Sequence, residues 1–218
     1  MPELRITEDG SHTLYNSVVD ECYHSTHGAV QESMHIFIQN ALLFHKPQAS
    51  LSVLEIGFGT GLNAWLTCVE AEKRQMQINY HTLERYPVDA ALYTQLNYVD
   101  GEEERRCFRL MHTCEWNVPI QLTTFFTLRK EKTDLLQWKA EQYYDLIYFD
   151  AFSPEKQPEL WQESVFAQLY AQTNPGGVFI TYCAKGMVRR ALQSVGYCVE
   201  RIPGPPGKRE ILRAVRTI

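Results

Sequence analysis

One stretch, residues 51–63, constrains the fold of this chain more than any other. It reads Leu-Ser-Val-Leu-Glu-Ile-Gly-Phe-Gly-Thr-Gly-Leu-Asn, and its first six residues have the apolar, β-branched composition of a buried parallel strand. Gly57, Gly59 and Gly61 stand at alternate positions, and a helix-compatible segment follows to about residue 73. Glycines let the backbone turn sharply and let a ligand lie against it. Strand, glycine turn and helix in this order predict the start of a nucleotide-binding crossover.

The charges around this loop indicate which ligand it holds. The dinucleotide fingerprint is Gly-x-Gly-x-x-Gly with a pyrophosphate on the helix N-terminus, whereas here Glu55 precedes three alternating glycines. A carboxylate repels a pyrophosphate and attracts the sulfonium and ammonium groups of S-adenosylmethionine (SAM). The next predicted strand, 77–84, ends in Glu84, where a carboxylate can accept both ribose hydroxyls. The alternative is an ordinary glycine turn and a surface glutamate; we favour SAM.

The composition is that of one globular α/β domain. The chain has 218 residues, of which 44% are hydrophobic, enough for a full core. No apolar run approaches the ~18 residues of a membrane span, and the polar N-terminus is unlike a signal peptide. The six cysteines form no Cys-x-x-Cys pair and the seven histidines lack metal-ligand spacing, so we expect a cytoplasmic protein with reduced thiols and no metal. We predict a single domain over 1–218, with an N-terminal hairpin and covering helix (1–50) before a Rossmann-like core (51–218).

The charge is distributed unevenly along the chain. The net charge is −5, yet residues 185–218 contain eight basic side chains against two acidic ones. Such asymmetry is either the footprint of a polyanion or a solvated helix face beside an edge strand guarded by charge. Composition alone leaves these two alternatives about even.

The rest of the chain alternates between strand-like and helical segments. Residues 4–15 predict a hairpin around the turn signal Asp9-Gly10, and residues 28–44 predict an amphipathic helix that could cover the ligand site. The stretch 100–120 has no clear pattern. Later strands are expected at 122–129, 144–149, 178–182, 197–202 and 210–215, and helices at 87–96, 158–172 and 185–194. This order predicts a mostly parallel seven-stranded sheet with helices on both faces and a reversed last pair.

Two further acids follow predicted strands. Asp134 comes after the strand at 122–129, where it could face an adenine amino group. Asp150 ends the strand at 144–149, which is expected beside the first strand, and ligands of open parallel sheets gather at the carboxyl ends of the central strands. Asp150 could instead be a helix N-cap before Pro154, and by itself this alternative is even with a catalytic role.

Several blocks of sequence carry a resemblance to a known family. Residues 55–63 and 148–161, the latter reading Tyr-Phe-Asp-Ala-Phe-Ser-Pro-Glu-Lys-Gln-Pro-Glu-Leu-Trp, closely resemble the methyltransferase domain of the bacterial tRNA wobble-uridine modification enzyme MnmC. The likeness continues at 175–177, 185–192 and 207–210. It implies a class I SAM methyltransferase fold that methylates the primary amine of 5-aminomethyl-2-thiouridine in the tRNA anticodon loop, giving 5-methylaminomethyl-2-thiouridine.

In two-domain members of this family, an FAD-dependent oxidase makes that amine. The printed sequence has no second glycine fingerprint, so the resemblance implies methylation and not oxidation. A separate oxidase or the upstream wobble-uridine modification complex is therefore a candidate partner, beside tRNA itself.

The resemblance assigns a role to Asp150, which matches the family's Asp in this motif, and the chemistry of the reaction suggests roles for other residues. Asp150 is expected to orient the amine and take its proton, and Phe152 and Pro154 are expected to shape a slot for a splayed uracil. Tyr23 and His24 could close over the amine or only pack, and the role of Glu32 is open. Phosphate contacts are expected from Arg189, Arg190, Lys208 and Arg209. Cofactor contacts are expected from Glu55, Gly57, Phe58, Gly59, Thr60, Gly61, Asn63, Glu84 and Asp134.

Other functions fit parts of the pattern. A SAM-dependent small-molecule methyltransferase would share the glycine loop. A polyamine-type aminopropyltransferase uses the same sheet, but it typically carries Gly-Gly-Gly and a second Asp in the fourth-strand motif, where Ser153 stands here. A degenerate subunit that only serves a partner is disfavoured by the intact glycines and Asp150.

Overall fold

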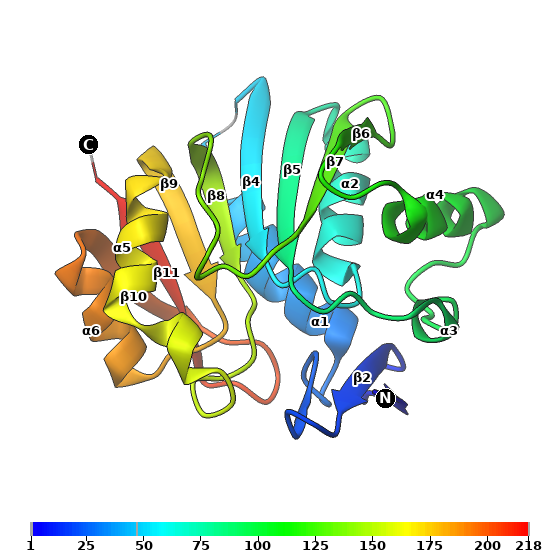
Figure 1. The fold of residues 1–218 in the computed structure, drawn as a ribbon, viewed down its shortest axis with the longest axis horizontal. Coiled ribbons are helices and arrows are strands. Elements are labelled where there is room, and N and C mark those ends of the chain that lie inside the picture. Colours follow the sequence, from blue (N-terminus) through cyan, green and yellow to red (C-terminus); the bar gives the residue numbers. More distant parts are fainter. Residues whose placement is uncertain (1, 47, 218) are drawn as a thin grey trace.

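The computed structural model describes residues 2–46 and 48–217 and contains one large central sheet (Figure 1). The strand order of this sheet is β10-β11-β9-β8-β4-β5-β7-β6. Its strands are β4 (Ser50–Ile56), β5 (Gln77–Glu84), β6 (Pro119–Gln121), β7 (Phe126–Lys132), β8 (Tyr144–Phe149), β9 (Thr173–Thr181), β10 (Tyr197–Pro203) and β11 (Glu210–Arg216). The five strands from β9 to β7 run parallel, while β6, β11 and β10 are antiparallel to their neighbours.

The sheet confirms the expected fold class but has one strand more than the seven we predicted. The additional strand is β6, which pairs antiparallel with β7 at the edge. It begins at a proline, a residue that sheets accept at edges because it cannot donate to the ladder. The reversed pair β10–β11 lies at the opposite edge, as predicted.

Helices cover both faces of the sheet. The helices are α1 (Ala29–Ser33), which continues as a π-helix η1 (Met34–Leu42), α2 (Leu62–Arg74), α3 (Ala90–Tyr93), α4 (Glu102–Thr113), a 3₁₀ helix η2 (Pro158–Trp161), α5 (Glu163–Ala171) and α6 (Gly186–Ser194). The segment 100–120, which we left without a prediction, contains α4 and β6. None of the helices in the described part of the chain has the length and apolar composition needed to cross a membrane.

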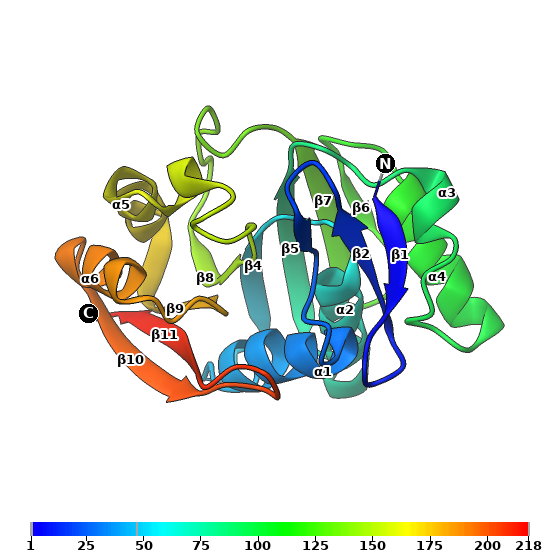
Figure 2. The same cartoon turned by 90° about the horizontal axis from the view of Figure 1, so that it is seen from below.

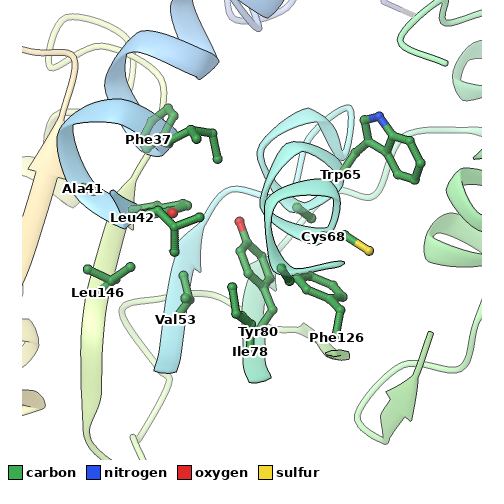
Figure 3. Packing of buried hydrophobic residues seen from close by; sticks show 14 of the residues in the cluster. Phe37, Ala41, Leu42, Val53, Trp65, Cys68, Ile78, Tyr80, Phe126 and Leu146 are labelled. Carbon is green, nitrogen blue, oxygen red and sulfur yellow. The ribbon is translucent and has the colours of Figure 1, made fainter. Parts of the chain in front are cut away.

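Alternation along the central strands divides the core between the two faces. Val53 and Tyr148 point to one face, and Leu54 and Phe149 point to the other. Figure 3 shows the first face, where Phe37 and the η1 helix pack over β4 and β8 and the side chains of α2 pack beside β5. The second face is closed by η2, α5 and α6, with Trp161 fully enclosed. Both faces are apolar, which is why the central strands are buried on both sides.

The N-terminal segment forms a separate antiparallel sheet of three strands, β1 (Glu3–Ile6), β2 (His12–Asn16) and β3 (Glu21–Cys22). The predicted hairpin around the Asp9-Gly10 turn is confirmed, with Glu3 opposite Tyr15. This small sheet lies at the carboxyl ends of the central strands (Figure 2). Glu21 accepts hydrogen bonds from the backbone N–H and the hydroxyl of Ser153, which tie the small sheet to the loop after β8.

Candidate active site

A cavity of about 490 Å³ lies at the carboxyl ends of β4, β5 and β8. Its floor is the glycine loop after β4, its walls are the segments that follow β5, β7 and β8, and residues 21–27 and 207–208 complete it. Cavities of 300–1,000 Å³ at this edge of an α/β sheet are typical ligand sites. The N-terminal segment and the central sheet therefore line one site.

Two glycines of the loop after β4 lie closely against other parts of the cavity. Gly57 has a φ of 92°, and a Cβ there would lie 2.9 Å from the carbonyl oxygen of Asp150. Gly59 has a φ of 49°, and a Cβ there would lie 3.0 Å from the ring of Tyr23. Both backbone conformations disfavour side chains; the approach at Gly57 is to backbone and leaves no room for a Cβ, and the approach at Gly59 leaves room only if the Tyr23 ring shifts. The loop is thus packed against the backbone of Asp150 at Gly57 and against the ring of Tyr23 at Gly59.

Glu84 ends β5 and is fixed by backbone donors. Its Oε2 accepts a hydrogen bond of 2.9 Å from Gly59 N, and its Oε1 accepts one of 2.7 Å from Tyr86 N. Burial raises the pKa of Glu84, and these two N–H donors oppose the shift. Each oxygen keeps a lone pair for a further donor, so the carboxylate can accept a pair of hydroxyls at the cavity surface.

Asp134 lines the same cavity after β7. Its Oδ1 accepts a hydrogen bond of 3.0 Å from Leu136 N, and its Oδ2 lies 2.7 Å from Arg85 Nη1. The glycine loop, Glu84 and Asp134 thus follow three neighbouring parallel strands and face one space. These carboxylate acceptors suit a ligand that donates from hydroxyls and from an amino group, as SAM can.

Asp150 follows β8 and faces the glycine loop. Its backbone N–H donates to Ile56 O at 3.1 Å, and its Oδ2 accepts a hydrogen bond of 2.8 Å from Asn63 Nδ2. Burial raises the pKa of Asp150 to about 7, with a further contribution from the negative charge of Glu32, while the Asn63 donor opposes it. A carboxyl group with such a pKa can gain and lose a proton near neutral pH, as a general base must.

The structure does not bring Glu55 to the surface of the cavity. Its side chain is 0% exposed, and Thr82, Tyr80 and Asn63 surround its carboxyl group. Burial raises the pKa of Glu55 to about 8, so the group is mostly neutral at pH 7. A direct contact with a cationic ligand, as expected from the sequence, is not available to a carboxyl group enclosed beneath the loop. Gly61 also lies outside the cavity lining, whereas Phe58, Thr60 and Asn63 belong to it.

The six residues expected to bind the substrate are divided between different places. Phe152 lines the main cavity, where its ring lies 5.1 Å from the ring of Tyr23. Pro154 and Arg209 line a neighbouring cavity of about 370 Å³, and Lys208 lines both cavities. Arg189 and Arg190 lie on α6, which packs against β10 and α5, and they line neither cavity. Any contact of these two arginines with a substrate would have to occur outside both cavities.

Three residues whose role the sequence left open line the main cavity: Tyr23, His24 and Glu32. His24 is buried, and burial lowers its pKa to about 4, so it is neutral at pH 7. Glu32 Oε1 lies 2.6 Å from Lys208 Nζ. The sequence contains no signal for Glu32, because it lies off the apolar stripe of its predicted helix and its partner is 176 positions away in the chain. No group of three His, Cys, Asp or Glu side chains suited to a metal ion occurs within residues 2–46 and 48–217.

The fold and the cavity together have the architecture of a known class of proteins. The class I SAM-dependent methyltransferase architecture has a mostly parallel sheet with a reversed edge pair, a glycine loop after the first strand and acids after the next strands. The sheet and the cavity described above have each of these features.

Comparisons with known proteins agree with this class. Residues 116–217 match a family model described as S-adenosyl-L-methionine-dependent methyltransferase. The chain is 29% identical over 215 residues to the tRNA 5-methylaminomethyl-2-thiouridine biosynthesis bifunctional protein MnmC of Ralstonia nicotianae, which covers 91% of this chain and 32% of that protein. It is 28% identical over 230 residues to the MnmC protein of a Marinomonas species, covering 96% of this chain and 33% of that protein. The chain thus spans about a third of the length of these relatives.

Solved structures share the fold. The crystal structure of MnmC2 from Aquifex aeolicus superposes with a TM-score of 0.81 at 23% identity, covering 98% of this chain and 70% of that chain. Spermidine synthase from Thermotoga maritima superposes with a TM-score of 0.58 at 14% identity, covering 100% of this chain and 72% of that chain. The resemblance to the MnmC proteins inferred from the sequence is confirmed, and SAM is the cofactor of the class to which the chain is similar.

Proposed function

We propose that this chain is a SAM-dependent N-methyltransferase of tRNA, which methylates the primary amine of 5-aminomethyl-2-thiouridine at the wobble position. The observation that carries the proposal is Asp150, a carboxyl group with a pKa of about 7 in the same cavity as the glycine loop. The substrate is inferred from the similarity to the MnmC proteins, whose name assigns them to 5-methylaminomethyl-2-thiouridine biosynthesis in tRNA.

The chemistry of an amine substrate fits the groups around Asp150. A primary alkylamine is mostly protonated at pH 7, and only the neutral amine has the lone pair needed for attack. When bound, SAM supplies an electrophilic methyl group. The carboxylate of Asp150 would orient the amine by a hydrogen bond and accept its proton, and the amide of Asn63 would keep that carboxylate in position. Gly57, Gly59, Glu84 and Asp134 are proposed to hold the cofactor.

The cavity also offers features for the base. Phe152 and Tyr23 meet edge to face at its wall and would enclose a uracil ring. Since the anticodon loop is single-stranded, its base can be splayed into a pocket at low cost. Lys208 and Arg209, next to the smaller cavity, are proposed to contact the backbone phosphates. Arg189 and Arg190 stay a weaker part of this proposal because they line neither cavity.

The proposal has consequences for the protein's surroundings. The aminomethyl group must be made by another activity, so a separate FAD-dependent oxidase or the upstream modification complex would act before this chain. Since its substrate is tRNA, we propose a cytoplasmic location. We also propose that residues 1–218 act as one domain, because residues 21–27 and the central sheet line the same cavity.

A transfer assay tests this proposal. The protein is incubated with SAM labelled in its methyl group and with tRNA whose wobble uridine carries the aminomethyl group, and label is measured in the nucleosides. The proposal predicts label in 5-methylaminomethyl-2-thiouridine. Label that stays in SAM while SAM binds would reject the substrate. A parallel incubation with putrescine and decarboxylated SAM tests the aminopropyltransferase alternative, whose fold the chain shares; formation of spermidine would favour it.

A further inference from the structure

The side-chain amine of Lys208 lies at the main cavity, beside the carboxylate of Glu32. Lys208 Nζ lies 2.6 Å from Glu32 Oε1 and 5.2 Å from the centre of the Tyr182 ring. Glu32 is 8% exposed, and its other oxygen accepts a hydrogen bond of 2.7 Å from Ser25 N. The backbone donor fixes the carboxylate, and the remaining oxygen faces the ammonium.

Together these groups have the chemistry of a site for a primary ammonium ion. A buried carboxylate beside an aromatic face is a combination that binds alkylammonium groups. Lysine ends in –CH₂–NH₃⁺, the same group that the proposed substrate carries on its uracil ring. Asp150 is close enough to this pair to feel both charges. After burial, the charge of Glu32 is the next factor that raises the pKa of Asp150, and the charge of Lys208 lowers that pKa. An ammonium held here would therefore lie close to the proposed base.

Lys208 also has access to a second environment. It lines the smaller cavity, together with Arg209, Lys185 and Glu210 and with Ser153 and Pro154 of the loop after β8. Lys185 is paired with Glu155 and Glu210 with Arg201, so Lys208 and Arg209 are the cations through which this cavity would attract an anion. Arg209 is exposed and forms no ion pair within the described part of the chain. A phosphodiester in the smaller cavity would offer Lys208 an anionic partner in place of Glu32.

We propose that Glu32 and the ring of Tyr182 form the subsite for the substrate's primary ammonium, which Lys208 fills in the free protein and leaves for a tRNA phosphate when the base enters. The identity of the amine rests on the proposed function, whereas the ammonium subsite does not. A small amine without a phosphate must compete with Lys208. A tRNA substrate draws Lys208 into the smaller cavity and meets a vacated subsite.

Binding of n-butylammonium tests the subsite. Calorimetric titration compares the wild type, Lys208→Gln, the double variant Lys208→Gln/Glu32→Gln, and Lys73→Gln. Lys73 is the matched control, since it is an exposed lysine on α2, outside both cavities, that lies 3.2 Å from the carboxylate of the buried Glu70. Lys208→Gln should bind the amine at least about tenfold more tightly than the wild type and the control, because hydrogen bonds to charged groups contribute about this much or more. The double variant should lose the gain.

Equal affinities in the wild type and Lys208→Gln would overturn the subsite, and so would a gain that survives the loss of Glu32. Thermal unfolding of each variant verifies that it is folded. Lys208→Met, a side chain of similar length, serves for the same comparison if Lys208→Gln does not unfold cooperatively.

Steady-state kinetics test the exchange of Lys208. In Lys208→Gln, KM should fall for the free nucleoside 5-aminomethyl-2-thiouridine and rise for tRNA carrying the same base. A rise of both KM values would mean that Lys208 only contacts the substrate, and the exchange would be overturned. If the wild type methylates neither compound, the proposed function fails, and the butylammonium titration still decides the subsite.

Discussion

Asn63 Nδ2 donates a hydrogen bond of 2.8 Å to Oδ2 of Asp150. Asn63 is the second residue of α2, directly after the glycine loop, and Asp150 directly follows β8. The bond therefore joins the loop proposed to hold the cofactor to the group proposed to take the proton. Because an amide donor stabilises the ionised carboxylate, the same bond also moderates the rise of the Asp150 pKa that burial causes.

Replacement of Asp150 by Asn should remove the proton acceptor with little change in shape. In the wild type, kcat/KM should rise with pH through about 7, because only the ionised carboxylate accepts a proton and burial raises its pKa to about 7. Asp150→Asn should lose about 10²-fold or more in kcat, and its kcat/KM should keep rising above pH 7, because the amine must then lose its proton to water before it can attack. Transfer to tRNA measured from acidic to mildly alkaline pH, together with the Kd of SAM, checks the prediction. An unchanged profile at unchanged SAM affinity would assign the proton to another acceptor.

Replacement of Gly57 by Ala should disturb both the glycine loop and the position of Asp150. A Cβ would lie 2.9 Å from Asp150 O, and the φ of 92° is unfavourable for alanine. We expect a loss of about 1–3 kcal/mol in the free energy of unfolding and weaker binding of SAM. Urea unfolding and SAM titration measure the two effects. Gly176→Ala is a suitable comparison, since it has a φ of 80° but no atom within 4 Å of its Cβ position.

Replacement of Glu84 by Gln should weaken cofactor binding. The carboxylate accepts the N–H groups of Gly59 and Tyr86, and an amide nitrogen in place of one oxygen would oppose one of these donors. The Kd of SAM should rise by about 10–100-fold, the range expected when a charged hydrogen-bond acceptor is lost. Glu163→Gln, at an exposed position of α5, is the control and should leave the Kd of SAM unchanged. A Kd for Glu84→Gln equal to that of the control would remove Glu84 from the cofactor site.

Glu55 should make the wild type less stable as the pH rises. Its pKa is about 8 in the folded chain against an ordinary value of 4.5. Between these values the folded state keeps a proton that the unfolded state has released, so the free energy of unfolding falls with increasing pH by up to about 1.4 kcal/mol per pH unit.

Glu55→Gln keeps the shape of the side chain and has no proton to release. The Tm of the variant minus the Tm of the wild type should therefore increase as the pH is raised from about 4.5 to about 8. Thermal unfolding of both proteins across this range measures the difference. Parallel curves would show that the Glu55 carboxyl does not titrate between the folded and unfolded states as its burial implies.

The central strands could be predicted because their sequence pattern matches their burial. The strand at 144–149 begins and ends as predicted, since all of its residues except Asp145 are buried hydrophobic side chains inside the sheet. The strand predicted at 122–129 is instead β7, at Phe126–Lys132. Thr123 and Thr124 have β-branched side chains but belong to the turn after β6, and Lys130 is fully buried with its Nζ donating to His112 O. Tertiary contacts override local propensity at both places.

The helices were harder to predict where packing is one-sided. α4 buries only Phe108 and Met111 and exposes a charged face, so few apolar residues mark it in the sequence. The helix predicted for 87–96 shortens to Ala90–Tyr93, where Asp89 accepts from Ala91 N as the N-cap, and none of its residues is buried.

The candidate site also contains residues whose meeting the sequence could predict and residues whose meeting it could not. Residues of the glycine loop, Glu84, Asp134 and Asp150 are adjacent to strand ends, so the topology alone implies that they meet. The pairing of Glu32 with Lys208 joins α1 to the turn between β10 and β11, and the enclosure of Glu55 depends on Tyr80 and Thr82 of the neighbouring strand. Both are properties of packing that no local pattern contains.

The central claim, that Asp150 serves methylation of a wobble-uridine amine, has one most direct test. Wobble nucleosides are analysed by mass spectrometry in tRNA from cells that lack this chain and from the same cells supplied with the wild type or with Asp150→Asn. The account predicts that the unmethylated 5-aminomethyl-2-thiouridine accumulates without the chain and with Asp150→Asn, and that it is converted to the methylated form by the wild type. Full methylation in cells supplied with Asp150→Asn, or no accumulation of the amine in cells without the chain, would contradict it.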